Sequence, residues 1–518
     1  MKRSLSCVLA ALILSFAAAA RAQEKPAEKP AEKPAESAKK EPPKPEQSVT
    51  QHSIVIGGVP IAYTATAGTL VVRNEKGDPW GSIGYTAYVK RDAGSASRRP
   101  ITFAYNGGPG SSSIWLHMGA LGPRRIVTAD AGPTPPPPYQ VVDNAFSILD
   151  KTDIVMIDPV GTGYSKAVGD FKNKDFWGVD PDIESVSRFI KQYVGDNGRW
   201  NSPKYLLGES YGSTRSGGIV DYLQTREGMS FNGVILVSVA LDIEALFTYP
   251  GNERPYPFFL PTYTATAWYH KALPSPPKDL EPLLEEVRKY ALGPYTDALM
   301  KGDALPDAER HAVAEKLHQY TGLSVDYILK ANLRVTEGEF TQELLREHGE
   351  TIGRLDARFL GVSLDRLAKE ADYDPQEAAV AAAFTAAFLN YYKEELKFGE
   401  GKNYEVEADE IFKFWEWKHK PPGSPFPIPG LPNTGVDLAH ALAYNPNLQV
   451  LFLNGTFDLA TPFLATEYMV SHLGLEKKLQ PHIQMKYYPA GHMMYVQESS
   501  LKSFKADVAA FIEATDRL

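Results

Sequence analysis

The stretch KYLLGESYGSTRSGG, residues 204–218, carries the clearest signal for the fold. A short apolar run leads into Gly208-Glu209-Ser210-Tyr211-Gly212, and a helix-compatible stretch follows it. This is the G-x-S-x-G pattern in the order strand, sharp turn and helix, where the glycines permit the tight backbone that exposes the serine. The stretch therefore predicts a nucleophilic serine, Ser210, lifted out of the end of a β-sheet.

Strands and helices alternate on both sides of this turn. Short apolar strands are expected at residues 101–105, 153–157, 205–207, 234–239, 450–453 and 483–488, with helical stretches between several of them. Such alternation predicts an α/β fold with a mostly parallel central sheet covered on both faces. Further upstream, residues 53–92 combine β-branched and aromatic residues with turn signals, which predicts an N-terminal antiparallel meander.

A serine hydroxyl becomes a good nucleophile only when a histidine accepts its proton and a carboxylate orients that histidine. In the chain order Ser, Asp, His, both partners follow the serine on later strand ends. Asp458 follows the apolar strand in VLFLNGTFDLATP, and His492 follows the next strand in MKYYPAGHMMYV. We therefore predict a catalytic triad of Ser210, Asp458 and His492 on an α/β-hydrolase fold.

The strand pattern disappears between residues 245 and 445, where helical segments such as 281–290 and the stretch after Asp374-Pro375 replace it. Because strands of the same style resume at Leu448, this segment is interpreted as a large helical cap insertion rather than an independent domain. The expected organisation is a hydrolase core in two parts, residues 51–244 and 446–518, interrupted by the cap at residues 245–445.

The N-terminal residues predict export. Residues 1–22 combine a basic start, an apolar run and an Ala-Arg-Ala cleavage pattern, which is typical of a signal peptide. The apolar run is too short for a membrane-spanning helix, so we expect no transmembrane segment in the mature chain. Residues 23–50 repeat lysine, glutamate, proline and alanine, which predicts a disordered linker.

Composition limits the partners and the location of the protein. The net charge of −9 gives no basic footprint, so nucleic acid is not an expected partner. Cys7, the only cysteine, lies inside the predicted signal peptide, which excludes disulfides and a thiol nucleophile in the mature chain. An exported protein without cysteine fits a bacterial envelope, so a periplasmic or extracellular location is expected.

The stretch FAYNGGPGSSS, residues 103–113, places three glycines directly after an expected strand. A serine hydrolase needs two backbone N–H donors for the oxyanion, one from the residue after the nucleophile and one from a neighbouring strand-end loop. Tyr211 offers the first donor, and the glycine loop at residues 106–110 offers the second. A simple tight turn and a phosphate cradle are the alternatives, but no G-K-[ST] follows the glycines.

Five motifs together resemble the serine carboxypeptidases. NGGPGSSS, DPVGTGYS at residues 158–165, GESYG, NGTFD and AGHM are similar to segments of that family and follow its order. The resemblance implies a cap over the active site and peptide or protein C-termini as substrates, without a metal or cofactor. It also implies that Gly108 and Tyr211 form the oxyanion hole, and that Asn106, Gly107 and Glu209 bind the free carboxylate of the substrate.

The chain departs from the family pattern at two positions. Ser111 stands where most members have a cysteine, so the cap must be stiffened without the family's disulfides. Ala120 stands where the family has a glutamate just before Leu-Gly-Pro. The second carboxyl group that would help to keep a proton on Glu209 is therefore missing. The same triad also serves esterases, acyltransferases and other peptidases, and a non-catalytic tethered binding module is a further alternative.

Overall fold

The computed structural model describes residues 44–516, which include a ten-stranded mixed sheet. Nine strands follow one another in the order β1-β2-β3-β7-β4-β9-β10-β13-β14, and β8 (Lys166–Ala167) pairs with β3. The first three strands form the expected antiparallel meander: β1 (Gln47–Ile56), β2 (Val59–Arg73) and β3 (Pro79–Lys90).

The other six strands of the path are parallel to one another. They are β4 (Ile101–Tyr105), β7 (Asp153–Ile157), β9 (Lys204–Ser210), β10 (Gly233–Val239), β13 (Gln449–Gly455) and β14 (Ile483–Tyr488). Each of them includes one of the six stretches expected from the sequence. The predicted fold class, a mostly parallel α/β sheet with an N-terminal meander, is confirmed.

Both faces of the sheet are buried, as parallel sheets require. In β10, Val234 and Leu236 point into one core cluster, whereas Ile235 and Val237 point into another. The first cluster includes residues of α2 (Val179–Asp196), α3 (Tyr211–Glu227) and α12 (Gly435–Tyr444). The second includes residues of α10 (Pro375–Glu394) and α14 (Glu498–Thr515). Strand positions therefore alternate between two apolar layers rather than between core and solvent.

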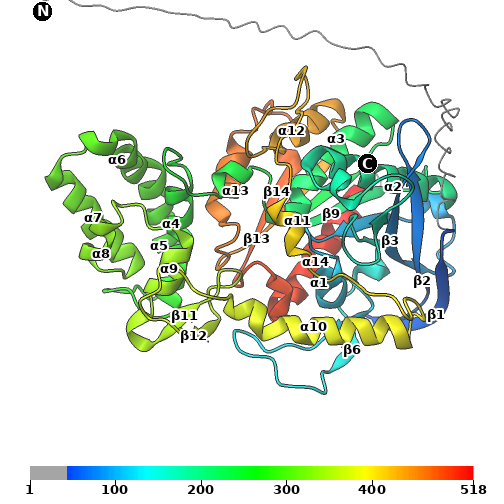
Figure 1. The fold of residues 1–518 in the computed structure, drawn as a ribbon, viewed down its shortest axis with the longest axis horizontal. Helices are drawn as coiled ribbons and strands as arrows, with labels where there is room; N and C mark the ends of the chain where they lie inside the picture. Colours follow the sequence, from blue (N-terminus) through cyan, green and yellow to red (C-terminus); the bar gives the residue numbers. More distant parts are fainter. Residues whose placement is uncertain (1–43, 517–518) are drawn as a thin grey trace, which may run out of the picture. The chain divides into compact units, whose positions relative to one another are not determined.

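The long segment between β10 and β13 has two roles in the fold. Its first part runs from α4 (Pro255–Tyr269) through α5 (Leu280–Tyr290) and α7 (Asp307–Thr321) to α9 (Glu337–Glu343) and is grouped to one side in Figure 1. It supplies most of a third core cluster, which also includes residues 457–465 after β13. Its later part returns to the sheet, because α10 and α12 cover opposite faces of it. The expected cap at residues 245–445 thus also supplies layers of the central domain.

Two local expectations differ from the structure. The insertion contains a short antiparallel pair, β11 (Glu350–Ile352) and β12 (Leu360–Val362), although its sequence suggested helices alone. Three-residue strands are too short to give a recognisable alternation. The expected linker at 23–50 also ends earlier, because residues 47–50 pair with β2 as the start of β1. The predicted signal peptide lies outside the described residues.

None of the helices described is long and apolar enough to cross a membrane.

A buried ion pair ties the sheet to the helices beneath the predicted nucleophile. Arg215 of α3 donates from Nε to the Asp182 carboxylate of α2 at 2.7 Å, and both side chains are almost fully buried. A terminal nitrogen of Arg215 also donates to the backbone carbonyl of Asn106 at 2.8 Å. One guanidinium therefore holds two helices and the loop after β4 together.

Breaking this pair should destabilise the fold strongly. Asp182→Ala leaves the Arg215 charge buried without its partner, and the free energy of unfolding should fall by about 3–5 kcal/mol. The matched control is Glu184→Ala on the same helix, which removes a partly exposed pair with Arg188 and should cost less than about 1 kcal/mol. Urea unfolding measures both changes. Equal losses in the free energy of unfolding would show that the buried pair stabilises the fold no more than the exposed pair does.

Candidate active site

Ser210 ends β9 in a strained conformation. Its φ of 59° and ψ of −128° lie outside the regions that non-glycine residues normally adopt, and α3 begins at the next residue. The two flanking glycines make this turn possible, because a Cβ on Gly208 would lie 2.2 Å from the Gly212 carbonyl oxygen. A Cβ on Gly212 would lie 2.9 Å from the Tyr105 carbonyl oxygen of β4. The G-x-S-x-G segment thus has the predicted geometry of strand, sharp turn and helix.

His492 and Asp458 meet at the ends of neighbouring strands. The Nδ1 atom of His492 lies 2.8 Å from Oδ2 of Asp458, and both side chains are buried. Asp458 also accepts hydrogen bonds from the backbone N–H groups of Ala460 and Thr461 and from the Thr461 hydroxyl. With Nδ1 held in this way, the other ring nitrogen of His492 is left for the cavity that Ser210 also lines.

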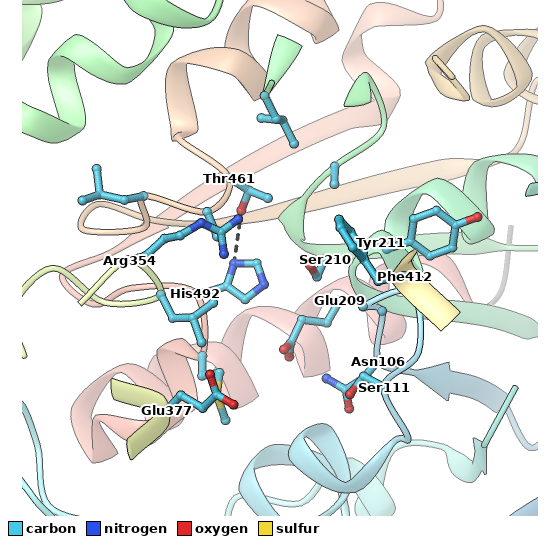
Figure 2. Close-up of a pocket in the computed structure, with 18 of the residues that line it drawn as sticks. Asn106, Ser111, Glu209, Ser210, Tyr211, Arg354, Glu377, Phe412, Thr461 and His492 are labelled. Atoms are coloured by element: carbon cyan, nitrogen blue, oxygen red, sulfur yellow. Dashed lines mark hydrogen bonds between the residues drawn. The ribbon is translucent and has the colours of Figure 1, made fainter. Parts of the chain in front are cut away.

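The electrostatic surroundings of His492 favour its charged form. Burial alone lowers the pKa of the imidazole, but the Asp458 carboxylate outweighs this effect through charge and hydrogen bonding, so the pKa is raised above its usual value. The charge of Glu209 raises the same pKa, whereas Arg354 lowers it. Arg354 lies on the same side of His492 as Thr461 in Figure 2.

The glycine loop after β4 lies directly against the turn at Ser210. A Cβ on Gly107 would lie 2.4 Å from the backbone nitrogen of Tyr211, so only glycine permits this approach. Gly108 has a φ of +97°, in the region that glycine alone adopts readily. The N–H of Tyr211 belongs to the first turn of α3, where N–H groups lack an acceptor within the helix. The two predicted oxyanion donors therefore come from adjoining backbone segments.

Glu209 is a buried carboxyl group beside the predicted nucleophile. Its side chain is 3% exposed, and its Oε1 accepts a hydrogen bond from the Tyr495 hydroxyl at 3.2 Å. No hydrogen-bond partner for Oε2 is found among residues 44–516. Burial raises the pKa of Glu209 to about 7, against the opposing effects of His492 and Tyr495. Near neutrality this carboxyl group can therefore carry a proton.

Tyr495 contacts Glu209, and the sequence analysis did not identify this neighbour. Its ring packs on Gly119, where a Cβ would lie 2.5 Å from the ring carbons, one residue before Ala120. Because position 120 is an alanine, the sequence suggested that no second group helps to keep a proton on Glu209. A phenol from a distant segment donates to Glu209 instead, and it does so without adding a second negative charge.

Ser210, His492 and Glu209 line one cavity of about 630 Å³ (Figure 2). Asn106, Gly107, Gly108 and Tyr211 line it as well, so seven of the eight residues predicted for the site border the same space. Asp458, the eighth, lies behind His492. Ser210 and His492 make no direct hydrogen bond in this arrangement, as far as the described residues show.

The cavity has two chemically different walls. Phe247, Phe412 and Trp417 form an aromatic group, with ring centroids 6.3 Å apart for Phe247 and Trp417 and 5.9 Å apart for Phe412 and Trp417. The Tyr211 ring also contacts Trp417, so this group adjoins the Ser210 turn. Acidic side chains line other parts of the cavity: Glu337, Glu377, Glu407 and Asp409.

A loop of the insertion clamps the two segments that carry Asp458 and His492. The backbone N–H of His492 donates to the Leu355 carbonyl at 2.6 Å, and the N–H of Gly491 donates to the Asp356 carboxylate at 3.0 Å. The Asp458 segment is held by the N–H of Leu459, which donates to the Arg354 carbonyl at 3.0 Å. Asp356 is buried and paired with Arg358 at 2.6 Å.

Sequence reasoning missed this loop, and it also missed Tyr495 and Glu407. Residues 353–358 read GRLDAR, a short polar stretch without a motif. Their role arises from contacts with residues more than a hundred positions away. The only local hint is Gly491, where a Cβ would lie 2.4 Å from the Leu355 carbonyl oxygen.

Comparison with known proteins agrees with this description. Residues 85–232 match the family model for serine carboxypeptidases, and this segment includes the glycine loop and the Ser210 turn. A search of curated proteins found no match. The chain resembles the crystal structure of Kex1, a prohormone-processing carboxypeptidase from Saccharomyces cerevisiae, with 15% identity and a TM-score of 0.55. The alignment covers 87% of this chain and 92% of Kex1.

More distant structures include a proline iminopeptidase from Mycobacterium smegmatis and an esterase from Thermogutta terrifontis. They are 13% and 12% identical, each with a TM-score of 0.34, over 90% and 87% of this chain and 99% of each of theirs. The resemblance to serine carboxypeptidases is confirmed, and the chain is a serine hydrolase with an α/β-hydrolase fold.

The contacts that the loop at residues 353–358 makes with the His492 and Asp458 segments predict that a residue far from Ser210 controls the reactivity of Ser210. Asp356→Ala frees the Gly491 N–H and leaves Arg358 with Asp130 as its remaining ion-pair partner, so His492 should lose its fixed position. The rate of Ser210 labelling by a fluorophosphonate should fall at least about tenfold, because small displacements of reacting groups are costly.

Asp372→Ala, which removes an exposed carboxylate from the same insertion, is the control and should label at the wild-type rate. Asp356→Asn keeps an acceptor for Gly491 and should lose less than Asp356→Ala. A folded Asp356→Ala variant with wild-type labelling would contradict the clamp.

Proposed function

We propose that the chain is an exported serine carboxypeptidase that releases C-terminal residues from peptides through an acyl-enzyme. The observation that carries this proposal is Glu209, a buried carboxyl group with a pKa of about 7 in the cavity of Ser210 and His492. A hydrolase that needs only a triad and an oxyanion hole has no use for such a group. The family match and the likeness to Kex1 support the same reaction class.

The proposed reaction begins with attack of Ser210 Oγ on the carbonyl carbon of the last peptide bond. The free ring nitrogen of His492 accepts the Ser210 proton, and Asp458 fixes the imidazole tautomer through Nδ1. The carbonyl oxygen becomes an oxyanion, which the N–H groups of Gly108 and Tyr211 would stabilise. His492 then gives the proton to the leaving nitrogen, and the C–N bond breaks.

The second half of the reaction uses the same residues. After the amino acid leaves, the acyl group remains as an ester on Ser210. Water attacks this ester while His492 accepts its proton, and the proton then returns to Ser210 Oγ as the acid product departs. No metal or cofactor takes part in this proposed sequence.

The free carboxylate of the substrate would be recognised by Glu209 and Asn106, with the backbone of Gly107 beside them. The Oδ1 of Asn106 accepts the Leu116 N–H at 3.0 Å, and the Asn106 side chain lowers the pKa values of Glu209 and Tyr495 through hydrogen bonding, so its amide lies beside them. Protonated Glu209 can donate a hydrogen bond to a carboxylate, whereas ionised Glu209 would repel it. Its raised pKa keeps the proton available up to about pH 7.

The proposed location follows from the sequence alone. Residues 1–22 have the pattern of a signal peptide and residues 23–46 that of a disordered linker, although residues 1–43 lie outside the described part of the chain. We propose that the mature enzyme works in the periplasm or outside the cell. There it would act on peptide or protein C-termini.

The central test compares two substrates that differ only at the C-terminus. A blocked dipeptide with a free carboxylate should be hydrolysed with a kcat/KM at least about a hundredfold above that of its C-terminal amide, because the amide cannot replace a charged acceptor. Ser210→Ala should abolish turnover of both, with a loss of about 10⁴-fold or more. Equal use of both peptides, or better use of simple esters, would move the assignment to an esterase or another peptidase.

The proton on Glu209 predicts a pH effect on binding. KM for the free-acid peptide should be nearly constant below about pH 6 and should rise as Glu209 ionises above about pH 7. Tyr495→Phe removes a hydrogen bond that stabilises the ionised form, so the rise should begin at a higher pH. Glu209→Gln, which always donates, should flatten the profile.

An ester substrate without a free carboxylate is the control, and its KM should not follow this profile. If wild type and Glu209→Gln gave the same KM profile with the free-acid peptide, Glu209 would have no part in carboxylate recognition.

A further inference from the structure

Two strained serines lie on neighbouring strands of the central sheet. Among the non-glycine residues with a positive φ in residues 44–516, only Ser210 and Ser238 belong to strands. Ser238 has a φ of +50° and lies in β10, which pairs with the strand that ends at Ser210. Such a conformation costs free energy and persists only where the surrounding structure enforces it, often at a functional site. The strain at Ser210 belongs to the sharp turn at the nucleophile, so the strain at Ser238 needs a reason of its own.

Ser238 is the extra residue of a bulge in β10. The residues on either side of it, Val237 and Val239, pair with Glu209 and Ser210 of β9, so Ser238 has no residue opposite it. A bulge bends its strand and redirects a side chain, and bulges are common next to active sites. The bulge therefore takes Ser238 out of the regular alternation of β10 at the level of the nucleophile.

The hydroxyl of Ser238 binds the backbone of His492. Ser238 is fully buried, and its Oγ donates to the His492 carbonyl oxygen at 2.7 Å. On the other side of the same residue, the N–H of His492 donates to the Leu355 carbonyl of the insertion. His492 belongs to no helix or strand, so its backbone is not held by a regular hydrogen-bond ladder. The insertion loop thus anchors the N–H of His492, and the bulge in β10 anchors its C=O.

A second serine connects the end of β10 to the nucleophile. Oγ of Ser213 in α3 donates to the Ser210 carbonyl oxygen at 2.6 Å and accepts the N–H of Ala240 at 2.7 Å. Ala240 lies two residues after Ser238. Residues 238–240 therefore form a short hydrogen-bonded connection between Ser210 and His492, which make no direct hydrogen bond with each other in the described chain.

We propose that Ser238 is a positioning residue, which keeps the imidazole of His492 at the correct distance from Ser210 Oγ by holding the His492 carbonyl. The strained bulge is what brings the Ser238 hydroxyl to that carbonyl. Ser238 is not among the residues that line the cavity, so its effect on the reaction is indirect. This inference rests on the catalytic roles proposed for Ser210 and His492, and it adds to them a residue that neither contacts substrate nor transfers a proton.

The first test removes the hydroxyl and keeps the bulge. In Ser238→Ala, kcat for an ester substrate should fall about tenfold or more while KM changes less than about twofold. A reacting group is displaced, whereas the walls of the cavity are unchanged. Ser187→Ala is the matched control, because Ser187 of α2 is also fully buried but its hydroxyl has no hydrogen-bond partner among residues 44–516. This control should keep the wild-type kcat.

Ser238→Gly separates the hydroxyl from the strain. Because glycine adopts a positive φ readily, the midpoint of urea unfolding should be higher for Ser238→Gly than for Ser238→Ala. Both variants lack the hydroxyl, so kcat should be reduced about equally in both. Recovery of kcat in Ser238→Gly would show that strain caused the loss in Ser238→Ala, and the positioning role would be wrong. If Ser238→Ala failed to fold, the kcat of Ser238→Gly would decide the question by itself.

Two reference variants separate this inference from the function on which it rests. Ser210→Ala and His492→Ala should both abolish turnover of the ester. Wild-type turnover in either of them would overturn the proposed triad and, with it, the positioning role. If both were inactive while Ser238→Ala and Ser238→Gly kept the wild-type kcat, the triad would stand and the positioning role of Ser238 would be overturned.

Discussion

The close backbone contact between the Gly107 loop and the Ser210 turn is the constraint on which the site depends. Strands β4 and β9 are parallel neighbours, with Tyr105 opposite Gly208, so the loops that leave them must pass each other at van der Waals distance. A side chain on Gly107 or Gly212 would force them apart. The Arg215 guanidinium, which binds the Asn106 carbonyl and Asp182 together, holds the loop in place from below.

The insertion supplies part of the lining of the cavity at Ser210. Its loop at residues 353–358 binds the backbone of Gly491 and His492, and its later segment supplies Glu407. Buried ion pairs, rather than disulfides, hold this later segment of the insertion in place. His419 of that later segment lies between Asp180 of α2 and Asp437 of α12, and although burial lowers its pKa, the two carboxylates raise it to about 9. The resulting charged bridge links the segment to two helices of the central domain.

Sequence reasoning succeeds where a local pattern carries the chemistry. Strand ends, the glycines around Ser210, and the order of Asp458 and His492 are visible as short motifs. The structure places Ser210 and His492 at one cavity, with Asp458 behind His492. It fails where a role depends on distant contacts. Tyr495 replaces the expected glutamate at Ala120 through packing on Gly119, and α10 covers the sheet although its sequence fits a cap helix. Neither contact leaves a trace in the local sequence.

Two buried groups in the cavity compete for protons. The charge of Glu209 raises the pKa of His492, and the charge of His492 lowers that of Glu209, so their titrations are coupled. In the proposed reaction, proton transfer from Ser210 would require neutral His492, and recognition of a substrate carboxylate would require protonated Glu209. A substrate carboxylate bound there would bring a negative charge to Glu209 and favour its protonation, so under the proposed function binding would itself promote the protonated form of Glu209. The Tyr495 hydroxyl suits this coupling because it can donate to Glu209 without contributing a third titration near neutrality, since burial holds its own pKa far above the usual value.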